Sequence, residues 1–222
     1  LPAPAPSPAP APAPAPVLPG GAIELPLGTN TFIEPLATTP LVVIGNSESN
    51  LIRTGLANDS VSGGGGNDTV FGGAGNDTVS GGDGDDVIGG GSAGDLMNGN
   101  KGNDAVNGGQ GDDTVRGGQG RDSLTGGLGT DELNGNFDDD VLTGGLGSDR
   151  FVLSRGSDTI TDFSFSEGDR IVIAIDPAIE PLLQYQLVQE GSNLLIVRDQ
   201  GITTLLNVDI NAFQAANPIQ FF

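Results

Sequence analysis

The sequence repeats itself every nine residues, without an insertion, from Gly45 to Val152. Aligned in nines and numbered 1 to 9 within each unit, this stretch gives twelve units. Position 1 is Gly in eleven units, position 2 is Gly in nine and Asn in three, position 6 is Asp in eleven, and position 8 is apolar in all twelve. So short a period excludes a long helix. Each unit has room for one short strand, near positions 7 to 9, and one glycine-rich turn over positions 1 to 6.

This repeat is poor in hydrophobic side chains, because only position 8 of each expected strand faces the interior. Burial of one apolar side chain stabilises a fold by about 1.5–3 kcal/mol. Ordering the backbone costs roughly 1–2 kcal/mol per residue, and glycine-rich chain costs more. One buried side chain therefore offsets only a fraction of the cost of ordering nine residues, and we expect the segment to need a further source of stability.

The recurring polar positions indicate what that source is. Glycine at positions 1, 2 and 4 permits positive φ, so that backbone carbonyl groups can converge, and Asn is the next most tolerant residue there. Carbonyl oxygens and the position 6 carboxylates form a hard ligand set that suits Ca²⁺, whereas Mg²⁺ prefers to keep its waters. Stacked turns would bring the carboxylates close together, which is repulsive unless a cation lies between them. The expected metal-binding aspartates are Asp59, Asp68, Asp77, Asp86, Asp95, Asp104, Asp113, Asp122, Asp131, Asp140 and Asp149.

The units resemble the RTX (repeats-in-toxin, haemolysin-type) nonapeptide GGxGxDxUx, a calcium-binding repeat. Residues 63–89 and 108–116 fit every specified position, and the later segments Asp158 to Asp162 and Gly168-Asp169 resemble the C-terminal flank of that family. The resemblance implies an all-β fold, a right-handed parallel β-roll with two units per coil. It also implies that Ca²⁺ lies between the loops of units n and n+2, held by the position 6 Asp and by backbone carbonyls. The glycines expected to take part are Gly63, Gly66, Gly72, Gly75, Gly81, Gly84, Gly108, Gly111, Gly117, Gly120, Gly126, Gly129, Gly144 and Gly147.

On that geometry the twelve units form ten inter-loop sites, five along each edge. Departures from the repeat predict that these sites are unequal. Ala57, Ala93, Asp138 and Glu48 replace the position 4 glycine, and Asn50 stands where the other units carry an aspartate. We therefore expect several bound Ca²⁺ ions, up to about ten, with the weakest sites at the turns of Ala57, Ala93 and Asp138.

The chain outside the repeats divides into three parts. Residues 1–19 contain nine prolines and are expected to form an extended Pro/Ala-rich linker. Residues 20–44 are expected to form a lead-in segment with one or two short strands, such as 39–44. Residues 153–222 are expected to form a small β-rich cap. Its expected elements are strands over 170–175, 182–188, 193–198 and 203–208, a helix that Asp209 caps and that ends at Ala216, and a final strand after Pro218. Asp158, Asp162 and Asp169 either ligate calcium at the end of the roll or only make turns.

The composition limits the chemistry of the chain. Eight basic and 29 acidic residues give a net charge of −21, so we expect no binding to nucleic acid or anionic membranes. The absence of Cys and His excludes disulfides, thiolate zinc sites and histidine-dependent catalysis. No apolar run approaches the length of about 18 residues that a membrane span needs. We therefore expect a chain with no enzymatic activity of its own.

We interpret the sequence as a secreted, extracellular calcium-binding β-roll module whose folding is driven by Ca²⁺ outside the cell. The family resemblance implies export by a type I secretion system, with the C-terminal region as an uncleaved signal. Because the chain begins with Leu1 rather than Met, we expect it to be a processed product or the C-terminal part of a longer protein, in which the Pro/Ala-rich segment is either a spacer after an upstream domain or a disordered N-terminal tail. Two alternatives remain: the non-catalytic tail of a secreted hydrolase or other polysaccharide- or protein-modifying enzyme, and a cell-surface adhesion or matrix module. The sequence does not indicate the oligomeric state.

Overall fold

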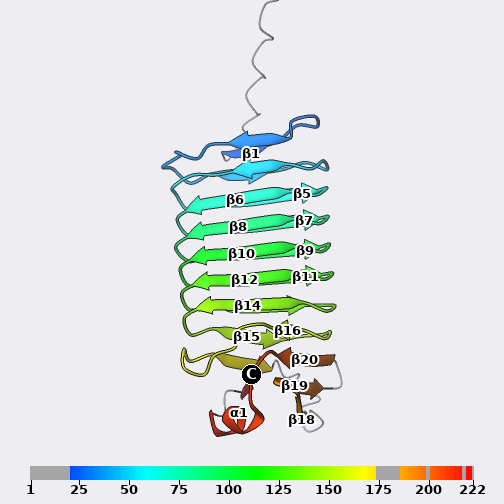
Figure 1. Ribbon diagram of the computed structural model, residues 1–222. Helices are drawn as coiled ribbons and strands as arrows, with labels where there is room; N and C mark the ends of the chain where they lie inside the picture. Colours follow the sequence, from blue (N-terminus) through cyan, green and yellow to red (C-terminus); the bar gives the residue numbers. More distant parts are fainter. Residues whose placement is uncertain (1–20, 174–185, 199–200, 217–218, 222) are drawn as a thin grey trace, which may run out of the picture.

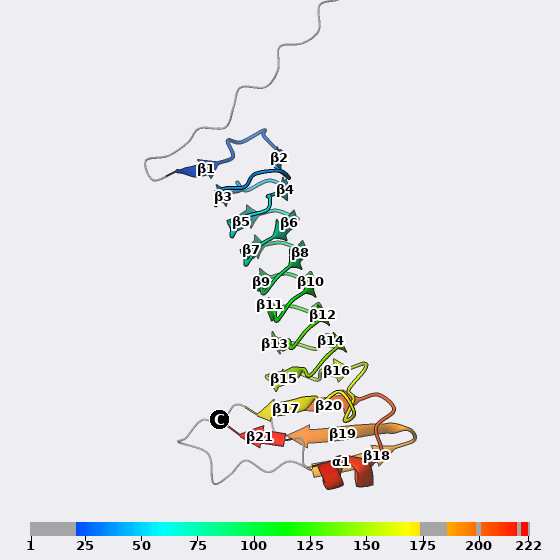
Figure 2. The same cartoon turned by 90° about the vertical axis from the view of Figure 1, so that its left-hand side faces the viewer.

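The structure is a computed structural model that describes residues 21–173, 186–198, 201–216 and 219–221, so the expected linker over 1–19 lies outside the described residues. The described chain forms an elongated stack of short strands, with a lead-in at one end and a helix and hairpin at the other (Figure 1 and Figure 2). The strands of the stack are β1 (Ala22–Glu24), β2 (Thr31–Ile33), β3 (Val42–Ile44), β4 (Leu51–Arg53), β5 (Ser60–Gly65), β6 (Thr69–Ala74), β7 (Thr78–Asp83), β8 (Val87–Ser92), β9 (Leu96–Lys101), β10 (Ala105–Gln110), β11 (Thr114–Gln119), β12 (Ser123–Leu128), β13 (Glu132–Asn136), β14 (Val141–Leu146), β15 (Arg150–Leu153), β16 (Thr159–Ile160) and β17 (Arg170–Ile173). The C-terminal elements are β18 (Gln186–Glu190), β19 (Asn193–Arg198), β20 (Gly201–Leu205), α1 (Ile210–Ala216) and β21 (Ile219–Phe221).

Two sheets make up the roll. Odd-numbered strands β1 to β17 form one sheet with β21, and even-numbered strands β2 to β16 form the other with β20, β19 and β18. Each repeat strand pairs in parallel with the strand two further along the chain, and the paired residues are 18 apart, as in Val70↔Ile88. One coil therefore contains two nonapeptides, and the expected all-β parallel roll is confirmed. Parallel pairing continues past both limits of the repeats, to β2 and β3 and to β16 and β17, so the count of twelve units remains a prediction from the sequence.

The strands are longer than the sequence predicted. We expected a strand only over positions 7 to 9, but β6 (Thr69–Ala74) covers these positions and positions 1 to 3 of the next unit. The turn is therefore reduced to positions 4 to 6. The reason is that Gly73 and Ala74 pair with Gly91 and Ser92 of the next coil, so a glycine with positive φ at position 2 does not end the strand.

The core is a single file of apolar side chains in each sheet. The position 8 residues are all buried, none more than 3% exposed, as predicted; they are Ile52, Val61, Val70, Val79, Ile88, Met97, Val106, Val115, Leu124, Leu133, Leu142 and Phe151. Towards the C-terminus, Phe151, Phe163, Phe165 and Phe213 pack with ring centroids 5.2–6.1 Å apart. This aromatic cluster joins the end of the core to helix α1.

The glycines of one unit have two different roles. Gly64 at position 2 and Gly66 at position 4 have φ values of 108° and 88°, which L-residues with a side chain rarely adopt. Gly63 at position 1 is not in the left-handed region, so our expectation of positive φ there was wrong. A Cβ at Gly63 would instead collide with the carboxylate of Asp68. The glycine at position 1 therefore provides space for the aspartate of its own unit.

The ends of the stack largely follow the prediction. The lead-in contains three short strands, β1 to β3, rather than one or two. At the C-terminal end, β17, β18, β19 and β21 overlap the expected strands, β20 begins two residues earlier than expected, and residues 174–185 lie outside the described residues. The predicted helix cap is confirmed, because Oδ1 of Asp209 accepts hydrogen bonds from the N–H groups of Asn211 (2.9 Å) and Ala212 (3.1 Å). In the described ranges no helix is long and apolar enough to cross a membrane.

Gly64 and Gly65 are neighbours in β5 and allow a matched test of the backbone. Gly64→Ala puts a methyl group against the carbonyl oxygen of Asn46 at positive φ, so we expect a loss of about 2–4 kcal/mol in unfolding free energy. At Gly65 the nearest atom to a Cβ is Cα of Ser47, at 3.6 Å, and φ is not left-handed. Gly65→Ala should change stability by less than about 1 kcal/mol, in the stabilising direction. Urea unfolding at saturating calcium measures the unfolding free energy of both variants. Equal losses would contradict the conclusion that close packing and positive φ require glycine at Gly64 but not at Gly65.

Candidate metal centre

The turns direct their aspartates into the roll along two columns. The Asp68 column lies where the chain passes from an odd-numbered to an even-numbered strand, and the Asp59 column lies on the opposite edge. The Asp68 column consists of Asp68, Asp86, Asp104, Asp122, Asp140 and Asp158, and the Asp59 column of Asp59, Asp77, Asp95, Asp113, Asp131, Asp149 and Asp169. None of these side chains is more than 3% exposed. All eleven predicted aspartates therefore lie in the columns, and Asp158 and Asp169 extend them beyond the repeats.

A ladder of hydrogen bonds fixes one oxygen of each carboxylate. The backbone N–H of an aspartate donates to Oδ1 of the aspartate one coil further on, as from Asp68 to Asp86 and from Asp95 to Asp113, both at 2.7 Å. Along both columns these distances lie between 2.7 and 3.3 Å. The ladder runs from one coil to the next, so it holds every carboxylate in the same orientation.

In most column aspartates the second carboxylate oxygen has no such donor. In the described part of the chain, ten aspartates have a buried Oδ2 without a hydrogen-bond partner: Asp68, Asp77, Asp86, Asp95, Asp104, Asp113, Asp122, Asp131, Asp140 and Asp149. A buried carboxylate oxygen without a partner is strongly destabilising. Ten of them at equivalent positions fit a row of cation sites rather than a local defect.

Each of these oxygens points into a space that the position 1 glycine leaves open. Oδ2 of Asp77 and the carbonyl oxygen of Gly90 both lie closer than 3.0 Å to the point where a side chain at Gly72 would place its Cβ. The same pair of oxygens, one from the unit itself and one from the next coil, surrounds Gly63, Gly81, Gly90, Gly99, Gly108, Gly117 and Gly126. Carboxylate and carbonyl oxygens around a space of this kind fit a hard divalent cation.

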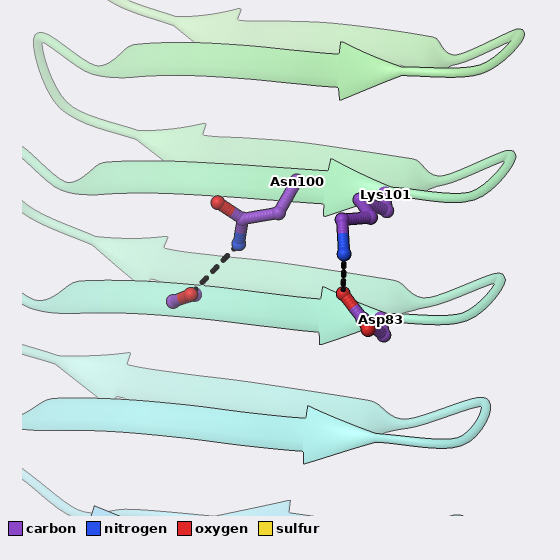
Figure 3. A network of polar contacts seen from close by, with 4 residues as sticks. Asp83, Asn100 and Lys101 are labelled. Carbon is purple, nitrogen blue, oxygen red and sulfur yellow. Dashed lines mark hydrogen bonds and ion pairs between the residues drawn. The ribbon is translucent and has the colours of Figure 1, made fainter.

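The basic residues of the repeats do not neutralise these columns. None of the five between residues 45 and 152 is buried. On the outer surface Lys101 forms an ion pair with Asp83 (2.9 Å), and Nδ2 of the neighbouring Asn100 donates to Oγ of Ser80 (2.8 Å) (Figure 3). Arg150 pairs in the same way with Glu132 on an adjacent coil. These contacts link coils outside the roll and leave the interior charge uncompensated.

Burial raises the pKa of the column aspartates from Asp68 onwards along the chain. The N–H donor of the ladder opposes this effect, and the charges of neighbouring carboxylates add to it. The pKa rises from 3.8 to about 6 for Asp68, about 7 for Asp95 and Asp104, and about 8 for Asp140, which faces the charges of Asp158, Asp122 and Asp138. Without a cation the folded columns therefore hold protons near neutral pH.

A family model of the RTX calcium-binding nonapeptide repeat, built on four copies of the repeat, matches the chain at residues 44–79, 53–88, 66–97, 89–124 and 125–160. These matches cover residues 44–160, more than half of the chain. The chain belongs to this RTX family. Calcium is thus the cation that the repeats imply.

Among solved structures, the chain is similar to the extracellular lipase LipA from Serratia marcescens, at 17% sequence identity and a TM-score of 0.31. The similarity covers 90% of this chain and 42% of the lipase chain, so this chain spans less than half of the lipase's length. No protein of curated function matches the chain.

The predicted glycines lie where carbonyl groups surround the columns. The position 1 glycines Gly63, Gly72, Gly81, Gly108, Gly117, Gly126 and Gly144 lie against the carboxylate of their own unit. The position 4 glycines Gly66, Gly75, Gly84, Gly111, Gly120, Gly129 and Gly147 have φ values between 88° and 139° in the turns. That these carbonyls ligate calcium remains a prediction. The described residues contain no group of three or more acidic side chains around one point, because each turn of the RTX roll directs a single carboxylate into its column.

Asp59 differs from the other predicted ligands. Its Oδ1 accepts from the N–H of Leu41 (2.8 Å) and its Oδ2 from the N–H of Gly55 (3.0 Å), so neither oxygen lacks a partner. The turn that contains Ala57 has no left-handed residue, whereas Ala93 and Asp138 adopt glycine-like φ values of 75° and 70°. The first turn of the Asp59 column therefore differs in conformation and hydrogen bonding from the other turns, whereas the turns of Ala93 and Asp138 resemble those with glycine at position 4.

The three flanking aspartates differ in their hydrogen bonds. Both carboxylate oxygens of Asp162 accept backbone N–H groups, from Gly144 and Gly145. Oδ1 of Asp169 continues the ladder, and its Oδ2 accepts from the N–H of Ser164 (2.8 Å). Asp162 thus bonds to the preceding coil, Asp169 closes its own turn as well as the ladder, and Asp158 continues the Asp68 column. Calcium ligation by these three aspartates remains a prediction.

A second ladder, at position 5, was missed by the sequence analysis. Oδ1 of Asn58, Asp85 and Asp112 accepts from the N–H of the position 5 residue one coil later, at 2.7–2.9 Å. Asn or Asp occupies position 5 in seven of the twelve units, and this was the signal that could have revealed it. The outer ladder needs no cation, so it stabilises the stack of turns independently of the columns.

The raised pKa values predict how pH acts on the RTX roll. Between about pH 4 and pH 8 the folded, cation-free chain binds more protons than the unfolded chain, whose aspartates titrate near 3.8, so its stability falls as pH rises. Calcium competes with these protons. Calcium uptake by cation-free chain that is already folded should therefore release protons, whereas uptake that starts from the unfolded chain, whose aspartates are ionised at pH 6, should release almost none. Calorimetry at pH 6 in two buffers of different ionisation enthalpy counts the protons, and a count of zero from chain that circular dichroism shows to be folded before calcium is added would contradict the raised pKa values.

Asp113 and Asp59 provide a matched pair of carboxylates in the same column. Asp113→Asn removes a charge next to an unpartnered Oδ2 in mid-stack, and we expect it to raise the calcium midpoint of folding by roughly threefold to tenfold and to reduce its steepness. In Asp59 both oxygens already accept backbone donors, so Asp59→Asn should have a much smaller effect. Calcium titrations of both variants by circular dichroism measure the difference. A larger shift for Asp59→Asn would mean that the unpartnered oxygens are not the metal ligands.

Proposed function

We propose that this chain is a calcium-driven folding module that binds several Ca²⁺ ions, up to ten, between the coils of its two aspartate columns. The observation that carries this proposal is the set of ten buried Oδ2 atoms without a hydrogen-bond partner. Each of these Oδ2 atoms would bind a cation that lies in the adjacent space between two coils. Without one, the columns place repulsive, desolvated charge beside a thin hydrophobic core.

The donor set supports calcium in particular. The residues that would hold the ion are the position 6 aspartates, through Oδ2, and the glycines at positions 1 and 4, through their carbonyl oxygens. Bound there, Ca²⁺ would supply positive charge and a flexible coordination sphere of oxygen ligands. Mg²⁺ requires a tighter octahedron and gives up its water reluctantly, so it is a poor substitute.

Calcium-dependent folding supports a location outside the cell. Extracellular calcium modules bind with dissociation constants of about 10⁻⁴–10⁻³ M, which cytosolic calcium does not reach. On this proposal the chain stays unfolded before export by a type I secretion system and folds after it meets external calcium. The C-terminal region acts as the secretion signal.

We further propose that the chain has no catalytic role of its own and serves a domain that precedes it. The sequence has neither His nor Cys, and the buried aspartates are engaged in the ladders of the roll. A catalytic or binding activity of the parent protein would then belong to the upstream domain.

The central test is the far-ultraviolet circular dichroism of the purified chain. In chelator we expect the spectrum of a largely unfolded chain, and at millimolar Ca²⁺ a cooperative gain of β signal, with no comparable gain at the same concentration of Mg²⁺. A chain that keeps its full β signal in excess chelator would refute calcium-driven folding. Equilibrium dialysis at saturating calcium then counts the ions.

A further inference from the structure

Arg198 is the one buried basic side chain among the eight of this chain, at 9% exposure. It lies at the end of β19, where it pairs with Gly201 across the β19–β20 hairpin. Its Nη2 donates to Oγ1 of Thr203 at 3.3 Å, and Thr203 is fully buried. A guanidinium kept away from solvent in this way needs a carboxylate or several acceptors.

The hairpin takes the place of a further coil on the even-numbered sheet, directly after β16 in the stack (Figure 2). β20 pairs in parallel with β16 so that Thr204 lies beside Thr159. The N–H of Thr204 donates to the carbonyl oxygen of Asp158 at 2.8 Å, just as the N–H of Thr159 donates to that of Asp140. Thr203 therefore stands where a repeat would carry the next aspartate of the Asp68 column.

The tip of the hairpin also stacks on the last turn of that column. A Cβ at Gly201 would collide with the carbonyl oxygen of Gly156. Within the repeats, a Cβ at Gly145 would collide in the same way with the carbonyl oxygen of Gly127, which belongs to the preceding coil. Gly156 and Asp158 belong to the same turn, between β15 and β16. The hairpin thus lies against the turn of Asp158, and through Thr203 it holds the guanidinium of Arg198 at the register position that follows that aspartate.

The charge around Asp158 differs from that around the rest of its column. Burial raises the pKa of Asp158 to about 6, and the positive charge of Arg198 acts in the opposite direction. For the other column aspartates with a raised pKa, every neighbouring charge raises it further. Asp158 is also not among the aspartates with a buried, unpartnered Oδ2.

We propose that the guanidinium of Arg198 closes the Asp68 column as a built-in cation, in the role that calcium has between the earlier coils. The hairpin then docks on the roll without a metal ion of its own. A permanent charge with five donors in a rigid plane suits this task better than a lysine. The Asp59 column ends differently, because the N–H of Ser164 satisfies its last carboxylate.

This inference rests on the proposed function for the role of calcium in the columns, but the arginine–aspartate pair lies within the chain and can be tested separately. The readout is amide hydrogen exchange, followed by mass spectrometry on the calcium-saturated full chain. The informative amides are those of Thr204 and Leu206, which donate to the carbonyl oxygens of Asp158 and Ile160 and so report docking of the hairpin.

Arg198→Gln should accelerate exchange of these two amides by about tenfold or more, since it leaves a buried carboxylate without its cation. The matched control is Arg116→Gln, which removes the same charge from an exposed residue of β11 and should leave the exchange unchanged. Arg198→Lys should retain part of the protection. Asp158→Asn combined with Arg198→Gln should restore most of it, because neither buried charge then remains.

Equal exchange in Arg198→Gln and Arg116→Gln would overturn the proposal. So would a double variant no better protected than Arg198→Gln, because an arginine that only fills space is not rescued by removal of a carboxylate. If Arg198→Gln does not fold, the lysine and double variants still decide the question. A wild-type chain that shows no response to calcium would refute the proposed function alone, and the same exchange comparison would still test the pair.

Discussion

Buried like charges at a fixed spacing are the constraint on which the rest of this structure depends. Each coil adds two carboxylates to the interior, one per column, and the N–H ladder satisfies only one oxygen of each. The apolar core contributes one side chain per nonapeptide and cannot offset so much desolvated charge. The basic residues of the repeats remain outside. On the proposed function the roll is therefore a conditional fold, which needs positive charge in the spaces between its coils.

The glycine and the aspartate of one unit act as a pair in meeting this constraint. Glycine at position 1 leaves the space into which the carboxylate of the same unit points, and glycine at positions 2 and 4 gives the backbone the φ values that bring carbonyl oxygens alongside. The outer ladder at position 5 runs opposite to the inner one: there the side chain accepts from the following coil, whereas at position 6 it accepts from the preceding coil. Each turn is thus bound to both neighbours by side chains as well as by the sheets.

Much of this could be predicted from the sequence, because a strict period converts local residue types into columns. The inward position 8 and the stacking of the position 6 aspartates follow from the period and its residue types, and the parallel roll follows from the resemblance of the units to the RTX repeat. The strand length could not be predicted in this way, because Gly73 looks like a turn residue until its partner Gly91 is known. Asp59 could not be separated from its equivalents, because its second oxygen is satisfied by the N–H of Gly55, a contact set by how that particular turn closes. The role of Arg198 was also invisible, since it depends on a hairpin that is not part of the repeat.

The 18-residue register has a consequence for how such a roll can change in length. A pair of nonapeptides inserted into the stack adds one coil, about 4.8 Å of height, and leaves both ends facing as before. A single nonapeptide would move every strand on its N-terminal side to the opposite sheet, and whatever the chain carries there would be turned to the other side of the roll. Duplication or loss of two repeats therefore changes only the length of the roll. Duplication or loss of a single repeat also changes the side of the roll on which the N-terminal part of the chain lies. Evolution of a protein that uses this roll as a spacer is thus restricted by the parity of its repeats.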